Sequence, residues 1–234
     1  MPTTKRALST LDSLSTATAL HDVSALSAAV AVRMLVAVAR SSNLRMLSTV
    51  AQTSNLLLVV LVGVPGSGKS TFAHDLISGA PSEAGGWARI SQDVLGSRGK
   101  CIKRAEAALR AGEHLVIDRC NFDRTQRAYW LNIRSDKPPS RRLAVYLPLD
   151  EAAARERVLA RGVHEGGVDT ASMSESKIAD IIHRMHSSMR VPTKDEGFDE
   201  RILVSNAEQR DAALQRIWSL ADMLAEQAGG AAAS

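Results

Sequence analysis

The sequence predicts an α/β fold with a mainly parallel β-sheet, and two features of its pattern support this. From Leu56 onward, short apolar runs alternate with longer helix-like segments, which is typical of strand-helix-strand units. Residues 56–62 are apolar throughout, as expected of a central strand that is covered on both faces. With 234 residues, 45% of them hydrophobic, the chain can bury a full core; this composition excludes collagen, a fully disordered chain and a polytopic membrane protein.

The elements follow one another in a regular order along residues 56–226. Each expected strand is a short apolar run, and each expected helix is a mixed segment that separates or follows these runs. One domain over residues 56–228 accounts for them, and residues 229–234 are predicted to be a disordered tail. The expected strands are 56–62, 88–90, 114–117, 143–147 and 202–204, and the expected helices are 70–77, 100–111, 123–133, 150–160, 174–189 and 207–226.

Residues 1–55 differ from the rest and are predicted to be a low-complexity leader. They are rich in Ala, Ser, Thr and Leu, with five basic residues against two acidic ones, which is typical of an organelle transit peptide. A disordered leader without a targeting role, or translation that starts at Met34 or Met46, are the alternatives. The most apolar part, 24–39, is too short to span a bilayer and contains Arg33, so no stable membrane association is expected.

The cysteine content bears on the cellular compartment. Cys101 and Cys120 are too few for a disulfide framework and have no metal-ligand spacing, so a reducing compartment is expected. The prediction is an intracellular protein, located in the nucleus or, if residues 1–55 are a transit peptide, in a mitochondrion or plastid.

The strongest motif lies between the first strand and the first helix. Residues 63–70 read GVPGSGKS, which matches the phosphate-binding P-loop pattern G-x-x-x-x-G-K-[ST] in full. The glycines allow backbone N–H groups to turn toward phosphate oxygens, and the N-terminus of the following helix favours anions. Lys69 is expected to bridge the β- and γ-phosphates, and the Ser70 hydroxyl is expected to bind Mg²⁺. The predicted nucleotide-binding residues are Gly63, Pro65, Gly66, Ser67, Gly68, Lys69, Ser70 and Thr71.

This motif refines the fold prediction to a three-layer P-loop NTPase fold and predicts ATP and Mg²⁺ as cofactors. A glycine-rich turn without a ligand is the alternative interpretation.

Two aspartates follow predicted strands and are candidates for roles beside the phosphates. Asp118 ends the apolar run 115–117, as the carboxylate of a Walker B strand does, and is predicted to lie on the metal side. Asp93 follows the strand at 88–90 and is the candidate base for an acceptor hydroxyl. Alternatively, each aspartate only caps a helix or a turn.

Two arginines are candidates for stabilising the charge of a transferred phosphoryl group. Arg157 and Arg161 are four residues apart in a predicted helix and therefore share one face. The glycine-containing stretch 162–167 follows, and together they resemble the lid of small P-loop kinases. A solvated helix surface is the alternative.

The charge distribution indicates which kind of molecule could accept the phosphoryl group. Between Arg89 and Arg142 the chain has thirteen Lys or Arg residues against six Asp or Glu residues. A groove lined in this way would suit a polyanion. Aromatic residues make up only 3% of the chain, which argues against an extended platform for stacking bases.

The sequence resembles the kinase domain of polynucleotide 5′-hydroxyl kinases, most closely the kinase module of plant aprataxin-like proteins. The resemblance extends from Val59 to Phe198. It rests on five segments: GVPGSGKSTF at 63–72, RISQD at 89–93 followed by Leu95, Gly96 and Cys101, VIDRCN at 116–121 followed by Asp123 and Arg127, GVHEG at 162–166, and Pro192 to Phe198 with its EGF ending. One departure is Arg201, which occupies a position where the family has an apolar residue.

The resemblance implies a function and further site residues. Asp93 would activate a nucleic-acid 5′-hydroxyl, Arg157 and Arg161 would be lid arginines, and Asp118 with Asn121 would line the site. Asn121 and Arg127 are the further substrate-binding residues expected on this basis.

The function predicted from the sequence is an ATP-dependent phosphotransferase, a P-loop kinase that phosphorylates 5′-hydroxyl ends of DNA or RNA in nucleic-acid repair. A small-molecule kinase of the same fold is one alternative. An ATP-binding adapter that recognises nucleic-acid ends without transferring phosphate is the other.

Overall fold

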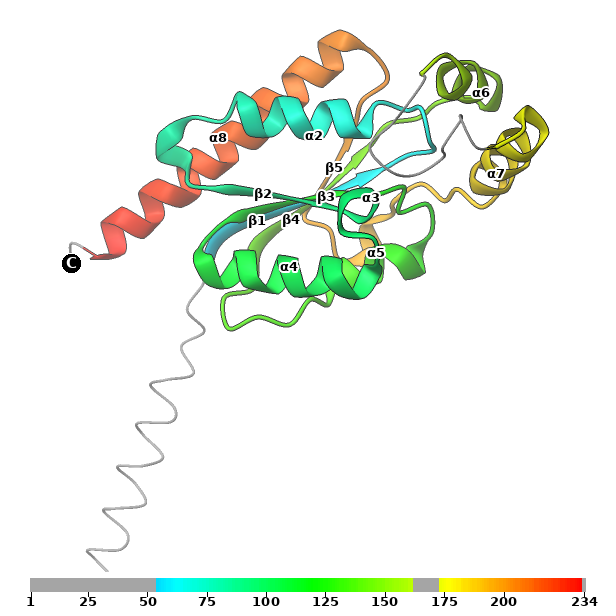
Figure 1. Ribbon diagram of the computed structural model, residues 1–234. Coiled ribbons are helices and arrows are strands. Elements are labelled where there is room, and N and C mark those ends of the chain that lie inside the picture. Colours follow the sequence, from blue (N-terminus) through cyan, green and yellow to red (C-terminus); the bar gives the residue numbers. More distant parts are fainter. Residues whose placement is uncertain (1–53, 162–172, 233–234) are drawn as a thin grey trace, which may run out of the picture. The chain divides into compact units, whose positions relative to one another are not determined.

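The computed structural model describes residues 54–161 and 173–232, and in this part of the chain a parallel sheet lies between two layers of helices (Figure 1). The strands have the order β2-β3-β1-β4-β5, and every neighbouring pair is parallel. The strand bounds are β1 (Ser54–Val62), β2 (Trp87–Ser91), β3 (His114–Asp118), β4 (Pro139–Tyr146) and β5 (Glu200–Leu203).

Helices cover both faces of the sheet. The helices α2 (Lys69–Ser78) and α8 (Ala207–Ala232) pack on one face, and α4 (Arg98–Ala111) and α5 (Arg124–Leu131) pack on the other (Figure 1). The pair α6 (Glu151–Ala160) and α7 (Glu175–Ser187) packs together, away from the two main layers. None of the helices in the described ranges is long and apolar enough to cross a bilayer.

The central strand explains the unbroken apolar run in the sequence. Leu57, Val59 and Leu61 belong to the core under α2 and α8, whereas Leu58 and Val60 belong to the core under α4 and α5. All five side chains are fully buried. Because both faces of β1 are covered, neither set of alternate residues can be polar.

The predicted strands and helices are all present, with differences at their ends. The strand β4 begins at Pro139 instead of Leu143, because it pairs with β1 from Ser54 onward. The helix α8 continues to Ala232 and so includes the start of the predicted tail. The structure adds the short helix α3 (Gln92–Leu95) and the 3-10 turns η1 (Ser82–Ala84) and η2 (Lys194–Glu196). Such short elements have too few residues to show a period in the sequence.

Arg201 is accommodated in β5 without a shift of register. It pairs with Ala144 of β4, and its guanidinium donates a hydrogen bond to the carbonyl oxygen of Pro192 at 3.1 Å. The next residue, Ile202, packs against the core under α2 and α8. The departure from the family pattern therefore leaves the strand intact.

Candidate active site

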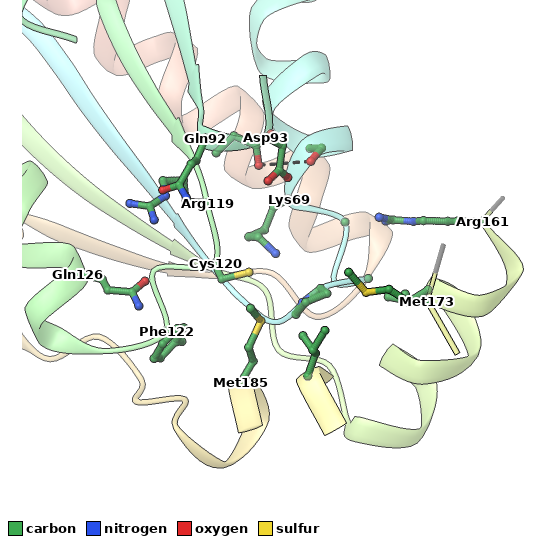
Figure 2. Close-up of a pocket in the computed structure, with 17 residues that line it drawn as sticks. Lys69, Gln92, Asp93, Arg119, Cys120, Phe122, Gln126, Arg161, Met173 and Met185 are labelled. Atoms are coloured by element: carbon green, nitrogen blue, oxygen red, sulfur yellow. Dashed lines mark hydrogen bonds between the residues drawn. The ribbon is translucent and has the colours of Figure 1, made fainter. Parts of the chain in front are cut away.

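A pocket of about 380 Å³ opens where β1, β2 and β3 end (Figure 2). Because these strands are parallel, the loops that follow them meet at one edge of the sheet, where open α/β sheets bind ligands. One wall is the P-loop wall, which we define as the loop segment 65–70; all of its residues except Ser67 line the pocket. A second, α3–α5 wall is formed by Gln92, Asp93, Arg119, Phe122 and Gln126.

Glycine is required at two positions of the loop between β1 and α2. A Cβ atom on Gly63 would lie 2.5 Å from Oγ of Ser67 and 2.7 Å from the carbonyl oxygen of Leu147. Gly68 has a φ of 93°, a left-handed conformation that other residues rarely adopt. The loop ends at the N-terminus of α2, where unpaired N–H groups favour a phosphate. The local geometry is therefore that of an anion cradle.

The predicted nucleotide-binding residues fall into two groups. Five of them line the pocket: Pro65, Gly66, Gly68, Lys69 and Ser70. The other three do not belong to its lining. Gly63 is buried beneath the loop, Ser67 contacts Lys69 from within the loop, and Thr71 is exposed on α2.

Lys69 is held against the loop that precedes it. Its ammonium donates a hydrogen bond to the carbonyl oxygen of Val64 at 2.7 Å and lies 3.4 Å from Oγ of Ser67. The side chain is almost fully buried, with a relative exposure of 7%. The buried ammonium of Lys69, at the end of the phosphate-binding loop, can neutralise the charge of a bound phosphate.

Asp118 links the end of β3 to the first turn of α2. One carboxylate oxygen accepts a hydrogen bond from the Ser70 hydroxyl at 3.3 Å. The other accepts two hydrogen bonds from the guanidinium of Arg89 on β2, at 2.9 and 2.6 Å. Arg89 therefore orients the carboxylate of Asp118 so that the other oxygen faces Ser70. Sequence reasoning assigned no role to Arg89, because its partner is on another strand.

Asp93 lies in the first turn of α3, directly after β2, and lines the pocket (Figure 2). The strand order explains its position. Because β3 lies between β1 and β2, the residues that follow β2 reach the side of the pocket away from β4. Asp93, Lys69 and Asp118 thus line one cavity.

The two candidate lid arginines lie on the same side of α6, facing the P-loop. Arg161, at the C-terminal end of α6, lines the pocket, and Figure 2 shows it on the opposite side of Lys69 from Arg119. Nη1 of Arg157 lies 3.5 Å from the carbonyl oxygen of Gly66, the upper limit for a hydrogen bond. The glycine-containing part of the predicted lid, 162–167, lies outside the described residues.

Asn121 does not face the pocket. Its side chain is fully buried, donates a hydrogen bond to the carbonyl oxygen of Leu61 at 2.8 Å, and accepts one from the indole of Trp130 at 2.9 Å. Its φ of 46° places it in the left-handed region, which asparagine tolerates better than most residues. Asn121 therefore joins the end of β1 to α5, and the prediction that it binds substrate is not supported by its placement.

Arg127 is also fully buried and saturated with partners inside the protein. Its guanidinium makes two hydrogen bonds to the carboxylate of Glu196, at 2.6 and 2.7 Å. It also donates to the carbonyl oxygens of Asn121 at 3.0 Å and Arg190 at 2.9 Å. Arg127 thus fixes the loop after β3, which carries part of the α3–α5 wall, and does not contact the pocket.

This network gives a structural reason for the specific EGF segment of the family pattern. Burial raises the pKa of Glu196, but the hydrogen bonds from Arg127 and from the Thr193 backbone outweigh it and hold the pKa below its ordinary value. Gly197 follows with a φ of 100°, and Phe198 inserts into the core under α4 and α5. The segment therefore stabilises the site through Arg127 and the core, without contacting the pocket.

Arg119 is a second residue to which the sequence assigned no role. It lines the pocket directly after Asp118, and its guanidinium lies 5.7 Å from the ring centre of Trp130. Burial lowers the pKa of Arg119 from its ordinary value. Only its place in the motif VIDRCN pointed to it, and that place does not reveal the direction of the side chain.

The pocket residues can hold Mg²⁺ together with a bound nucleotide. No group of three or more His, Cys, Asp or Glu residues capable of holding a metal occurs in the described ranges. Mg²⁺, however, needs only one or two protein oxygens when phosphate oxygens and water complete its shell. The adjacent oxygens of Ser70 and Asp118 provide this set. The pocket thus combines a phosphate cradle, a cation, two oxygen ligands and a separate carboxylate, which is a set suited to phosphoryl transfer.

Comparison with known proteins gives relatives in sequence and in structure. No protein-family model matches the chain. Over 147 residues it is 33% identical to a protein of Arabidopsis thaliana named transcription factor bHLH140. The matched region makes up 61% of this chain and 15% of that protein. Over 143 residues it is 33% identical to the bifunctional polynucleotide phosphatase/kinase of Schizosaccharomyces pombe. The matched region makes up 60% of this chain and 31% of that protein. The chain thus spans less than a third of these curated relatives.

The crystal structure of a fungal RNA kinase is similar in fold, with a TM-score of 0.57 and 16% sequence identity. The match covers 75% of this chain and 96% of that structure. At this identity the similarity establishes the fold alone. The chain therefore has the P-loop kinase fold, and it is related in sequence to polynucleotide phosphatase/kinases.

Proposed function

We propose that this protein is an ATP- and Mg²⁺-dependent kinase that phosphorylates 5′-hydroxyl ends of DNA or RNA. The observation that carries this proposal is the position of Asp93. Its carboxylate lines the same 380 Å³ pocket as Lys69 and Asp118. A protein that only binds ATP needs no carboxylate there, whereas transfer to a hydroxyl needs one.

The residues divide the proposed reaction between them. The hydroxyl oxygen of the acceptor forms a bond to the γ-phosphorus, the bond from that phosphorus to the bridging oxygen breaks, and ADP leaves. Asp93 accepts the hydroxyl proton. Lys69 neutralises charge on the transferred group, and Arg161 and Arg157 approach the same region from α6.

The metal is proposed to bind between Ser70 and Asp118. Bound there, Mg²⁺ neutralises charge on the phosphate oxygens. Arg89 keeps the second oxygen of Asp118 occupied and so fixes the orientation of the carboxylate. In this arrangement Asn121 and Arg127 have a positioning role, since both are buried and hydrogen-bonded within the protein.

Two findings favour a nucleic-acid end over a small metabolite as the acceptor. One is the sequence relationship to a polynucleotide phosphatase/kinase. The other is the excess of basic residues between Arg89 and Arg142, a segment that contributes the whole α3–α5 wall. The product, a 5′-phosphate end, is what a ligase requires, so a role in nucleic-acid repair in the nucleus or an organelle is part of the proposal.

The test is transfer of labelled γ-phosphate from ATP to a 5′-hydroxyl oligonucleotide by the full chain with Mg²⁺. Replacing Asp93→Asn should lower the transfer rate about a hundredfold or more without weakening ATP binding. The matched control is Asp136→Asn, since Asp136 is an exposed aspartate on a turn between α5 and β4.

Other outcomes would identify the alternatives. Labelling of sugars or nucleosides without labelling of any oligonucleotide would indicate a small-molecule kinase. Binding of ATP and of nucleic-acid ends without transfer to any acceptor would indicate an adapter.

A further inference from the structure

A buried ion pair adjoins the proposed metal site and joins Arg89 of β2 to Asp118 at the end of β3. Nε and Nη2 of Arg89 both donate hydrogen bonds to Oδ2 of Asp118, at 2.9 and 2.6 Å. The Arg89 side chain is 15% exposed and the Asp118 side chain is 4% exposed. Charges attract each other more strongly away from water than at a surface. In the protein without ligands, Arg89 therefore offsets most of the negative charge of Asp118.

The pairing of β2 with β3 produces this arrangement. Arg89 is opposite Val116 and is therefore diagonal to Asp118, which lies two residues further along β3. Residues two apart in a strand share a face, and Val116 packs into the core under α2 and α8. Arg89 and Asp118 thus lie on the face of the sheet that carries α2. Arg89 holds one carboxylate oxygen, and the other, Oδ1, lies 3.3 Å from the Ser70 hydroxyl.

The pocket has an excess of positive charge in the protein without ligands. Its charged lining residues are Lys69, Arg119 and Arg161 against Asp93 and Asp118. Arg89 adds another cation next to Asp118. A divalent cation that entered this pocket by itself would gain one carboxylate oxygen and would be repelled by the surrounding cations.

A nucleotide reverses this balance. Its triphosphate carries several negative charges and supplies oxygen ligands of its own, so that Mg²⁺ needs only one or two from the protein. Oδ1 of Asp118 and the hydroxyl oxygen of Ser70 are adjacent and meet that need, while Oδ2 stays with Arg89. The same residues therefore disfavour the metal without phosphates and favour it with them.

We propose that Arg89 is a positioning residue that makes the binding of a divalent cation depend on a bound nucleotide. It does so by holding Oδ2 of Asp118 and by offsetting the charge of that carboxylate. This inference rests on the proposed function and specifies how the same site takes up its metal: the cation binds with the nucleotide and not before it.

The test measures metal binding instead of activity. Mn²⁺ replaces Mg²⁺ as a paramagnetic probe, and electron paramagnetic resonance measures free Mn²⁺ in solutions of the full chain with and without β,γ-imido-ATP. The Mn²⁺ that this analogue binds by itself is measured separately and subtracted. The wild type should bind Mn²⁺ about tenfold or more tightly when the analogue is present, a usual size for the coupling between two ligands.

Variants of the ion pair identify its role. Arg89→Gln should raise the Mn²⁺ affinity of the nucleotide-free protein about tenfold, because it removes the compensating charge beside Asp118. Adding Asp118→Asn to Arg89→Gln should abolish this gain. Arg89→Lys keeps the charge and should keep most of the dependence on nucleotide. Arg104→Gln, which removes the exposed pair with Glu113, is the matched control and should behave like wild type.

Thermal melting of each variant controls for folding. If Arg89→Gln does not fold, the wild-type comparison and Arg89→Lys still decide the question. Equal Mn²⁺ affinity of the wild type with and without the analogue would overturn the inference, as would loss of the nucleotide dependence in Arg89→Lys. An unchanged nucleotide-free affinity in Arg89→Gln, or a gain that persists after Asp118→Asn is added, would also overturn it. Failure of the proposed function is distinguishable, because the wild type would then not bind the analogue at all.

Discussion

The P-loop wall consists of one continuous segment, residues 65–70, in which backbone conformation and a single lysine form the phosphate cradle. The α3–α5 wall is assembled from three separate segments, which follow β2, follow β3 and belong to α5. The first wall depends on local geometry, because the left-handed Gly68 and the hydrogen bond from Lys69 to Val64 both belong to the same loop. The second depends on packing, because its members are held in place by residues that never touch the pocket.

The largest effect is expected at the P-loop wall. Lys69→Ala should reduce the single-turnover rate of phosphate transfer by about a thousandfold, the effect seen when a preorganised group that stabilises transition-state charge is removed. Lys103→Ala, an exposed lysine on α4, should behave like wild type. A Lys69→Ala protein that transfers phosphate at nearly the wild-type rate would show that this wall does not work through its local cation.

The support of the α3–α5 wall can be tested with a pair of arginines on α5. Arg127→Ala should lower the free energy of unfolding by about 3–5 kcal/mol, because it leaves the buried carboxylate of Glu196 without its partner. Arg124 pairs with Asp195 at the same distance of 2.6 Å, but both side chains are more than half exposed. Arg124→Ala should therefore lower the free energy of unfolding far less than Arg127→Ala does. Equal losses in urea unfolding would show that burial does not distinguish the pairs.

Asp118 lies between the two walls and should respond mainly to metal concentration. Asp118→Asn should raise the Mg²⁺ concentration needed for half-maximal activity by about tenfold, since it removes charge beside Ser70 while keeping the size of the side chain. Saturating Mg²⁺ should restore most of the rate. Glu113→Gln, at the exposed pair with Arg104, is the control. An unchanged Mg²⁺ requirement would place the metal elsewhere.

The smallest effect is a pH dependence from Glu196. Its pKa is lower in the folded protein than in the unfolded chain, so its contribution to stability is complete above the ordinary glutamate pKa and is lost as the pH falls through the folded pKa. Glu196→Gln should therefore be less stable than wild type at neutral pH, and the difference should shrink on acidification. Urea unfolding between pH 7 and pH 3 measures this. A difference that grows at low pH would contradict the assignment.

The sequence was most informative where function depends on short-range geometry. The motif at 63–70 predicted the cradle, and Lys69, Ser70, Asp93 and Asp118 were all found around one pocket. It was least informative for residues whose partners are far away in the chain. Asn121 and Arg127 were expected to bind substrate, yet their partners include Leu61 and Glu196, which are 60 and 69 residues away in the chain.

Arg89 and Arg119 illustrate the same limit in the opposite sense, because the sequence assigned them no role although both lie at the site. Both lie in motifs that the sequence identified, but no period or spacing indicates that one orients Asp118 and that the other lines the pocket. The direction of a side chain near a strand end depends on which strands are neighbours. That information first appears in the order β2-β3-β1-β4-β5.

By itself, the sequence determined the α/β class, the order and approximate positions of the strands and longer helices, and the phosphate cradle, because apolar periodicity and glycine conformation act within a few residues. Only the tertiary structure decided which polar residues support the site and which face the ligand. The reason is energetic: a buried arginine or asparagine is tolerated only with its hydrogen bonds completed, and in this protein those bonds come from distant segments brought together by folding.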